Sequence, residues 1–255
     1  MTKNTPDSRN TKLPRRGVLI PVVVAAAALA LTLVMVLTPS LRGSAVTGSA
    51  GVPGTAQPSA ASDQATGDAV QSLERLARRT PNDPMALGKV DAPVVMVAYS
   101  EFQCPFCGKF ARDTEPTLIK KFVDNGTLRI EWRDFPYLGP ESTTAAQAGR
   151  AAAAQGKFWA FHDTLYAHQT PVNSGKLTET YLTGIAKDLG MDATRFGLDL
   201  TSDQSAAAVQ KDFTEGQSIG VTGTPAFLIN GRPIIGAQPT ATFVAAVEQA
   251  AAAAR

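Results

Sequence analysis

The sequence predicts an α/β fold in which a block of helices is inserted between the two halves of a sheet. A short Val-rich run, typical of a buried strand, leads directly into a helical pattern, and a second strand pattern follows it. Two further strand patterns occur only near the C-terminus, after a long helical stretch. The 255 residues, 44% of them hydrophobic, are enough to bury a core of one large or two small domains.

The charge balance argues against a nucleic-acid partner. The chain has 24 Lys and Arg residues against 22 Asp and Glu residues, a net charge of +2, so it lacks a large basic field to hold a phosphate backbone. It has two cysteines, three positions apart, which excludes a framework of structural disulfides.

The N-terminal segment predicts a membrane anchor. Residues 17–37 carry no charge and match the roughly 20 apolar residues that cross a bilayer. Basic residues precede them, among them Lys3, Lys12, Arg15 and Arg16. Residues 1–16 are therefore expected to be a cytoplasmic tail, with everything after the anchor outside the cytoplasm. A cleavable signal peptide is the alternative, but its apolar region should be only about 7 to 15 residues long.

Residues 38–83 are expected to form a flexible linker with one short helix. Small and polar residues dominate up to about Gly67, so this part buries too little apolar surface to offset its ordering entropy. Asp68 to Arg79 then predicts an amphipathic helix that begins at a capping Asp68. The globular domain is expected to span residues 84–255.

The first half of the predicted sheet surrounds the cysteines. Pro93 to Tyr99 (PVVMVAY) is typical of a strand buried on both faces. After Cys104-Pro105-Phe106-Cys107, a helical pattern continues to Asn125-Gly126, with Phe110, Leu118 and Phe122 as its apolar positions. Leu128 to Phe135 alternates apolar and polar residues and predicts a second strand.

The second half of the sheet follows the helical insertion, which is expected to span about residues 138–217. Ala226 to Ile229 and Arg232 to Ile235 flank Asn230-Gly231, a dipeptide preferred in tight hairpins, and Pro233 places the second strand at a sheet edge. A final helix is expected over residues 239–253.

The CxxC segment predicts a redox-active pair. Pro105 suits the first position of a helix, where a missing N–H costs nothing, so Cys104 lies at the helix start. Its sulfur then faces unpaired N–H groups and the positive end of the helix dipole, which lowers the thiol pKa below about 8.5 and makes Cys104 the nucleophile. Cys107, on the same helix face, can attack that sulfur and close a disulfide. This disulfide would be the only redox group, with no other cofactor.

Two structural alternatives are weaker. A zinc site needs two more ligands, and the chain offers only His162 and His168, which fit better as surface or helix-packing residues. No metal is therefore expected. A purely structural disulfide across so short a loop would add little stability, because this stabilisation grows with loop length.

Thr224-Pro225 precedes the predicted hairpin in the stretch VTGTPAF. From the residues alone, Pro225 is an ordinary strand-edge proline, since about 5–6% of X-Pro bonds in folded proteins are cis.

From about Pro84 to Ala250 the chain resembles the DsbA family of thioredoxin-fold proteins, especially the membrane-anchored forms of Gram-positive and actinobacterial species. The resemblance rests on ALGKVDAPVVMVAYSEFQCPFC, WRDFPYLG, FWAFHDTLYAHQ and GVTGTPAFLINGRPIIGAQP together. It implies a thioredoxin-like fold with an inserted helical domain. It also implies a cis-proline at Pro225 and substrate contacts through Thr224; we add Pro105 and Phe106 to this expected substrate-binding set.

Two positions depart from the family pattern. The oxidising enzyme of Gram-negative bacteria has His where this chain has Phe106, which implies a less oxidising pair here. The buried acid that members often carry six residues before the first cysteine is Ala98. Glu101 is the nearest carboxylate and a candidate proton relay for Cys107, although an exposed surface acid is the favoured reading because Glu is so commonly exposed.

The sequence therefore predicts a monomeric, extracytoplasmic thiol:disulfide oxidoreductase that introduces disulfides into exported proteins with free thiols. By resemblance, its reoxidant would be a quinone-linked membrane protein of the DsbB or vitamin K epoxide reductase type. Two alternatives stay open: a reductase or isomerase that holds the pair reduced, and an anchored peptide-binding or chaperone module without turnover.

Overall fold

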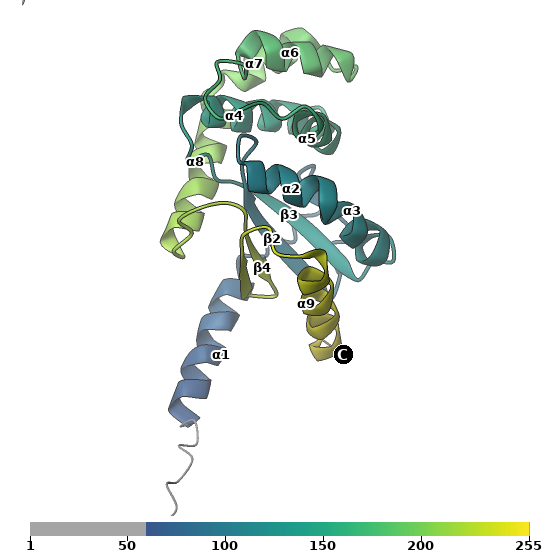
Figure 1. The fold of residues 1–255 in the computed structure, drawn as a ribbon, viewed down its shortest axis with the longest axis vertical. Helices are drawn as coiled ribbons and strands as arrows, with labels where there is room; N and C mark the ends of the chain where they lie inside the picture. Colours follow the sequence, from purple (N-terminus) through teal and green to yellow (C-terminus); the bar gives the residue numbers. More distant parts are fainter. Residues whose placement is uncertain (1–59, 255) are drawn as a thin grey trace, which may run out of the picture. The chain divides into compact units, whose positions relative to one another are not determined.

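The computed structural model describes residues 60–254, which form an α/β domain around a five-stranded mixed sheet (Figure 1). The strands are β1 (Ala86–Leu87), β2 (Val94–Ser100), β3 (Leu128–Asp134), β4 (Ala226–Ile229) and β5 (Arg232–Ile235). Their order is β1-β3-β2-β4-β5; β2 and β3 are parallel, and the other neighbours are antiparallel. The expected tail and anchor, residues 1–37, lie outside the described residues. Among the residues described, none of the helices combines the length and hydropathy of a membrane span.

Helices cover both faces of the sheet. On one face lie α2 (Pro105–Asp113), α3 (Glu115–Leu118), the π-helical turn η1 (Ile119–Val123) and α9 (Thr240–Ala253). Their apolar side chains pack on alternate residues of β2 such as Met96 and Ala98. The opposite face, with Val97 and Tyr99, packs against Leu76 in the segment after α1 (Ala60–Glu74) and against Phe213 of α8 (Asp203–Ser218). Both faces of β2 are therefore buried, as its Val-rich sequence predicts.

The helical insertion lies between β3 and β4. It consists of α4 (Pro140–Ala154), α5 (Phe158–Ala167), α6 (Glu179–Asp188), α7 (Ala193–Leu200) and α8. Buried residues of α4, α5, α6 and α7 share a core that also includes Phe102, Cys104 and Cys107. The insertion, expected over about residues 138–217, thus packs directly on the cysteine segment.

The segment before β1 differs from the sequence prediction. The helix expected to begin at Asp68 begins at Ala60 and ends at Glu74, and the two-residue strand β1 was not predicted. The backbone N–H groups of Arg78 and Arg79, which precede the expected boundary at Pro84, donate hydrogen bonds to the Glu131 carboxylate in β3.

The polar side of β3 is buried. The alternation of this strand is real, but Arg129, Glu131 and Arg133 are covered by the segment after α1 and by the acidic residues of α8. Glu131 accepts hydrogen bonds from the guanidinium groups of Arg129 and Arg133 at 2.9 and 3.0 Å. The charged residues of this strand are therefore part of an internal ion-pair network, because buried charges are tolerated when they are paired.

The helix after the cysteines is interrupted, where one helical run was expected. Pro116 lacks the N–H that a continuous helix would use and crowds the preceding turn, so α2 ends at Asp113 and α3 begins at Glu115. The hairpin agrees with prediction: Asn230 and Gly231 have φ of 43° and 75°, the two positive values that a type I′ turn needs.

Candidate active site

The two cysteines lie where β2 gives way to α2. Cys104 is the N-cap of α2, with extended backbone (φ −67°, ψ 117°), and Pro105 occupies the first turn. The Cys107 N–H donates to Cys104 Sγ at 3.4 Å. Both residues are thiols, and Cys104 is 2% exposed. Position and capping are therefore those that the CxxC spacing predicts.

Thr224 and Pro225 lie opposite Cys104. The Thr224–Pro225 peptide bond is cis. The family resemblance implies this conformation, whereas the low frequency of cis X-Pro bonds in folded proteins favours trans. The Cys104 thiol donates to the Thr224 carbonyl oxygen at 3.2 Å. The Thr224 hydroxyl is buried and has no hydrogen-bond partner among residues 60–254, so it can turn to donate to the sulfur when the thiolate forms.

The two thiols have opposite pKa shifts. Hydrogen bonding by the Cys107 thiol lowers the pKa of Cys104 most, and burial opposes it. The Thr224 hydroxyl and the N–H groups of Cys107 and Phe106 complete the lowering, to about 6. Burial and the neighbouring Cys104 raise the pKa of the Cys107 thiol. At neutral pH the pair therefore holds one reactive thiolate and one protonated thiol, the division that thiol–disulfide exchange needs.

Three residues of the insertion, in α5 and in the loop that follows it, fix the loop before Cys104. The Gln169 amide donates to the carbonyl oxygens of Phe102 and Cys104 at 3.0 and 2.9 Å. The Tyr166 hydroxyl donates to the Glu101 carbonyl at 2.9 Å. The Asn173 N–H donates to the Gln103 side chain at 2.7 Å. Sequence reasoning missed this support, although two of the donors lie in or next to the stretch FWAFHDTLYAHQ that carries the resemblance.

Glu101 is buried rather than solvated, so the reading of it as a surface acid is wrong. It is 1% exposed, and neither carboxyl oxygen has a hydrogen-bond partner among the described residues. Burial raises the pKa of Glu101 to about 7; the Ser142 side chain partly opposes this, and the charge of Cys104 adds to it. The carboxyl is buried because the insertion closes over residues 100–104, a contact that the local sequence does not encode.

An apolar rim surrounds this buried chemistry. Phe106, between the cysteines, is 63% exposed, and Pro105 beside it is exposed too. Tyr137 is partly exposed, and burial followed by the charge of Cys104 raises its pKa. Tyr137 was not predicted, although it lies in the WRDFPYLG stretch. Thr224, Pro105 and Phe106 thus lie together around Cys104.

A family model described as Thioredoxin matches residues 80–249, which is most of the described domain. The Probable disulfide bond formation protein D of Bacillus cereus is 34% identical over 150 residues, 57% of this chain and 69% of that protein. The chain belongs to the DsbA-like family of thioredoxin-fold proteins.

Solved structures of DsbA-like proteins have the same fold. Oxidised BdbD of Bacillus subtilis superimposes with a TM-score of 0.63 at 26% identity, covering 67% of this chain and 94% of that one. For α-DsbA1 of Wolbachia pipientis the TM-score is 0.63 at 22% identity, covering 71% of this chain and 96% of that one, a likeness of fold alone.

Other curated relatives are much longer than the matching DsbA-like segment. The Na(+)/H(+) antiporter NhaA 1 of Salinispora arenicola is 35% identical over 177 residues, 69% of this chain. The match covers only 26% of that antiporter.

One histidine is a packing residue and the other a surface residue, the two kinds of position expected for them. His162 is buried among Phe102, Trp132 and Tyr166 and forms a 2.8 Å hydrogen bond through Nδ1 with Asp163. His168 ends α5 at the surface, where its Nδ1 lies 3.0 Å from the Thr164 carbonyl oxygen.

Proposed function

We propose that this DsbA-like protein is an extracytoplasmic dithiol oxidase that introduces disulfides into exported proteins. The observation that carries the proposal is the position of Cys104 at the start of α2, where the Cys107 N–H donates to its sulfur at 3.4 Å. The same surroundings lower the pKa of Cys104 to about 6 and so stabilise its thiolate. A stabilised thiolate favours the dithiol over the disulfide, so the disulfide form is readily reduced and hence oxidises other thiols.

The reaction proceeds by two exchanges at Cys104. A substrate thiolate attacks Cys104 Sγ, a bond forms between these sulfurs, and the Cys104–Cys107 bond breaks with its electron pair on Cys107. A second substrate thiolate then attacks the substrate sulfur of the mixed disulfide. The substrate leaves with a disulfide, and Cys104 and Cys107 keep the two electrons as a dithiol.

The exposed rim gives a substrate peptide a place to bind. Phe106 offers an apolar surface beside Cys104, and Thr224 lies next to a cis-proline on the other side of the sulfur. By the family resemblance, an extended segment of the substrate would lie against Thr224 and Pro225 with its thiol at Cys104.

Export and reoxidation complete the proposal. The uncharged segment 17–37 and the basic residues before it support a single-pass anchor with the domain outside the cytoplasm. By the family resemblance, the electrons pass from the dithiol to a quinone-linked membrane protein of the DsbB or vitamin K epoxide reductase type. An anchor would keep both proteins in one membrane.

The direction of the reaction is tested by oxidative refolding of a reduced disulfide protein. The full chain, supplied as the disulfide, should accelerate the recovery of native substrate, and Cys104→Ser should not. A chain that leaves refolding unchanged but rapidly reduces substrate disulfides as the dithiol would support the reductase alternative. Equal acceleration by Cys104→Ser would instead support the peptide-binding module.

A further inference from the structure

A small cavity lies behind Cys107, on the side away from the substrate rim. Its volume is about 10 Å³, roughly the space that one water molecule needs. Five of its lining residues carry a hydroxyl, thiol, carboxyl or imidazole group: Ser100, Cys107, Glu115, His162 and Tyr166. Ala98 lines the same cavity. The strand position that holds a buried acid in other family members therefore faces this space without one.

Glu115 supplies a carboxyl group to this cavity from another element. Because Pro116 interrupts the helix, Glu115 is the first residue of α3, and its side chain turns inward rather than following the surface of α2. The residue is 5% exposed. Its Oε2 lies 3.8 Å from His162 Nε2, beyond hydrogen-bond distance, so the imidazole does not neutralise the carboxylate by a direct bond.

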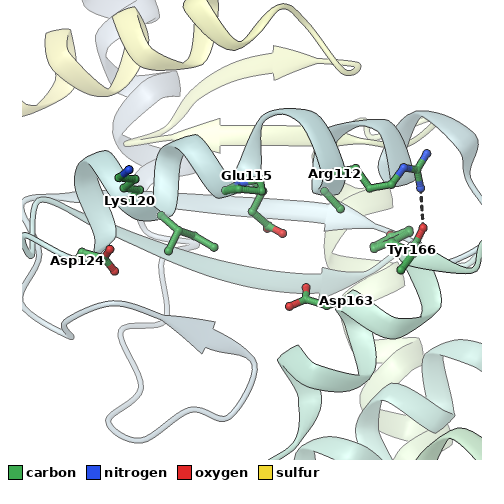
Figure 2. A pocket seen from close by; sticks show the side chains of 10 residues that line it. Arg112, Glu115, Lys120, Asp124, Asp163 and Tyr166 are labelled. Carbon is green, nitrogen blue, oxygen red and sulfur yellow. Dashed lines mark hydrogen bonds between the residues drawn. The ribbon is translucent and has the colours of Figure 1, made fainter.

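Glu115 also lines a pocket that is open to solvent. This pocket, of about 390 Å³, lies between α2–η1 and α5, and Figure 2 shows Glu115 and Asp163 reaching into it from the two sides. Tyr166 and Ala111 line both the inner cavity and the outer pocket. Glu115 therefore stands between the space behind Cys107 and bulk water.

The exchange reaction needs a proton at this place. When a substrate thiolate attacks Cys104, Cys107 leaves with the electron pair as a thiolate in a buried position, where charge is disfavoured. A carboxylic acid that donates its proton converts this thiolate to a thiol and itself becomes a carboxylate. In the reverse step the carboxylate takes the proton back, and Cys107 can attack the mixed disulfide.

We propose that Glu115 is the proton relay of Cys107 and that it exchanges this proton with solvent through the pocket in Figure 2. The proposal rests on Cys104 and Cys107 being the redox pair of the proposed function, and it holds for either direction of exchange. Glu115 thereby takes the place of the acid that is absent at Ala98.

The surroundings of Glu115 keep it protonated over a wider pH range than usual. Burial raises the pKa of Glu115. The electrostatic interaction with His162 opposes this increase, and the negative charge of Asp163 adds to it. Other ionisable groups that face it from neighbouring elements are Cys107, Arg112, Lys120, Asp124 and Tyr166. Arg112 is engaged with the Tyr166 carbonyl at 2.7 Å, and on α9 Glu248 is paired with Lys121. Glu115 is thus left as an acid able to donate.

The test is the pH dependence of the reaction between the oxidised full chain and glutathione. Mixed-disulfide formation at Cys104 is followed by acid quench and mass spectrometry. At each pH the measured rate is divided by the concentration of glutathione thiolate. In the wild type this rate should fall as pH rises through the pKa of Glu115, because the carboxylate has no proton to donate. Glu115→Gln should lower the rate at low pH on the order of 100-fold, the lower end of general acid catalysis, and remove the fall.

Three further variants separate the relay from other causes. Asp113→Asn removes an exposed carboxyl of the neighbouring helix, paired with Lys109, and should keep the wild-type profile. Glu115→Asp keeps a carboxyl and should keep the inflection, which a purely packing role would not predict. Glu101→Gln removes the buried acid in the loop before Cys104 and should keep the inflection as well.

An unchanged rate and profile in Glu115→Gln would overturn the proposal, and so would loss of the inflection in Glu101→Gln alone. Either result would leave the proposed function intact as long as the wild type reacts at Cys104. A wild type that forms no mixed disulfide at Cys104 would instead overturn the proposed function.

Discussion

Replacing Cys107 with Ser should trap covalent complexes between Cys104 and exported proteins. The variant keeps the Cys104 nucleophile at the start of α2 but removes the thiol that would release a bound substrate. The complexes should appear on non-reducing gels of cells that carry the full chain, disappear on reduction, and identify the substrates by mass spectrometry. Disulfide-forming activity itself should be lost, because the variant cannot hold the Cys104–Cys107 disulfide.

Cys104→Ser is the matched control, because it replaces the sulfur of the other cysteine with oxygen in the same way. It should lose activity and trap nothing, because Cys107 is buried at the base of the site and its thiol pKa is raised. Complexes formed through Cys107 in this control would reverse the assigned roles. Trapped partners that are all cytoplasmic would contradict the proposed location.

Glu131→Gln should destabilise the domain by about 3–5 kcal/mol, the range found when one partner of a buried ion pair is removed. The Glu131 carboxylate accepts from two arginine side chains and from the N–H groups of Arg78 and Arg79. Glutamine has one carbonyl oxygen and an NH₂ group that would face donors, so buried guanidinium charges lose their partner. Urea unfolding of the wild type and variant measures the difference.

Glu248→Gln is the matched control, because its partner Lys121 lies on the surface and both side chains are largely exposed. Its effect should stay within about 1 kcal/mol. A similarly small effect for Glu131→Gln would contradict the buried network.

The same network predicts a dependence of stability on pH. Burial by itself would raise the pKa of Glu131, but the Arg129 hydrogen bond, the Arg78 N–H and Arg133 outweigh it and lower the pKa. The folded-state pKa is thus below the unfolded value of about 4.3. The contribution of Glu131 is therefore complete above that value and is lost as pH falls through the folded-state pKa. In Glu131→Gln this acid-dependent part of the stability should be absent.

Features set by neighbouring residues were predictable from the sequence. The position of Cys104 follows from Pro105 after a buried strand, and the hairpin follows from Asn230-Gly231 between two short apolar runs. Both depend on backbone preferences over a few residues.

Features set by distant packing were not predictable from local patterns. Glu101 is buried because the insertion, a separate stretch of chain, closes over it. Arg78 was placed in the linker because its partners, Glu131 and Asp212, are 53 and 134 residues away. The proline break that turns Glu115 inward carried a signal, Pro116, but only the fold shows that Cys107 lies on the other side of the same cavity.

The most direct test of the account is the equilibrium reduction potential of the Cys104–Cys107 pair, measured against glutathione in the full chain. A stabilised Cys104 thiolate favours the dithiol and predicts a potential well above the roughly −270 mV of thioredoxin. Phe106, in place of the histidine of the Gram-negative enzyme, predicts a value below that enzyme's roughly −120 mV. A potential near or below about −270 mV would contradict an oxidase and favour a reductase.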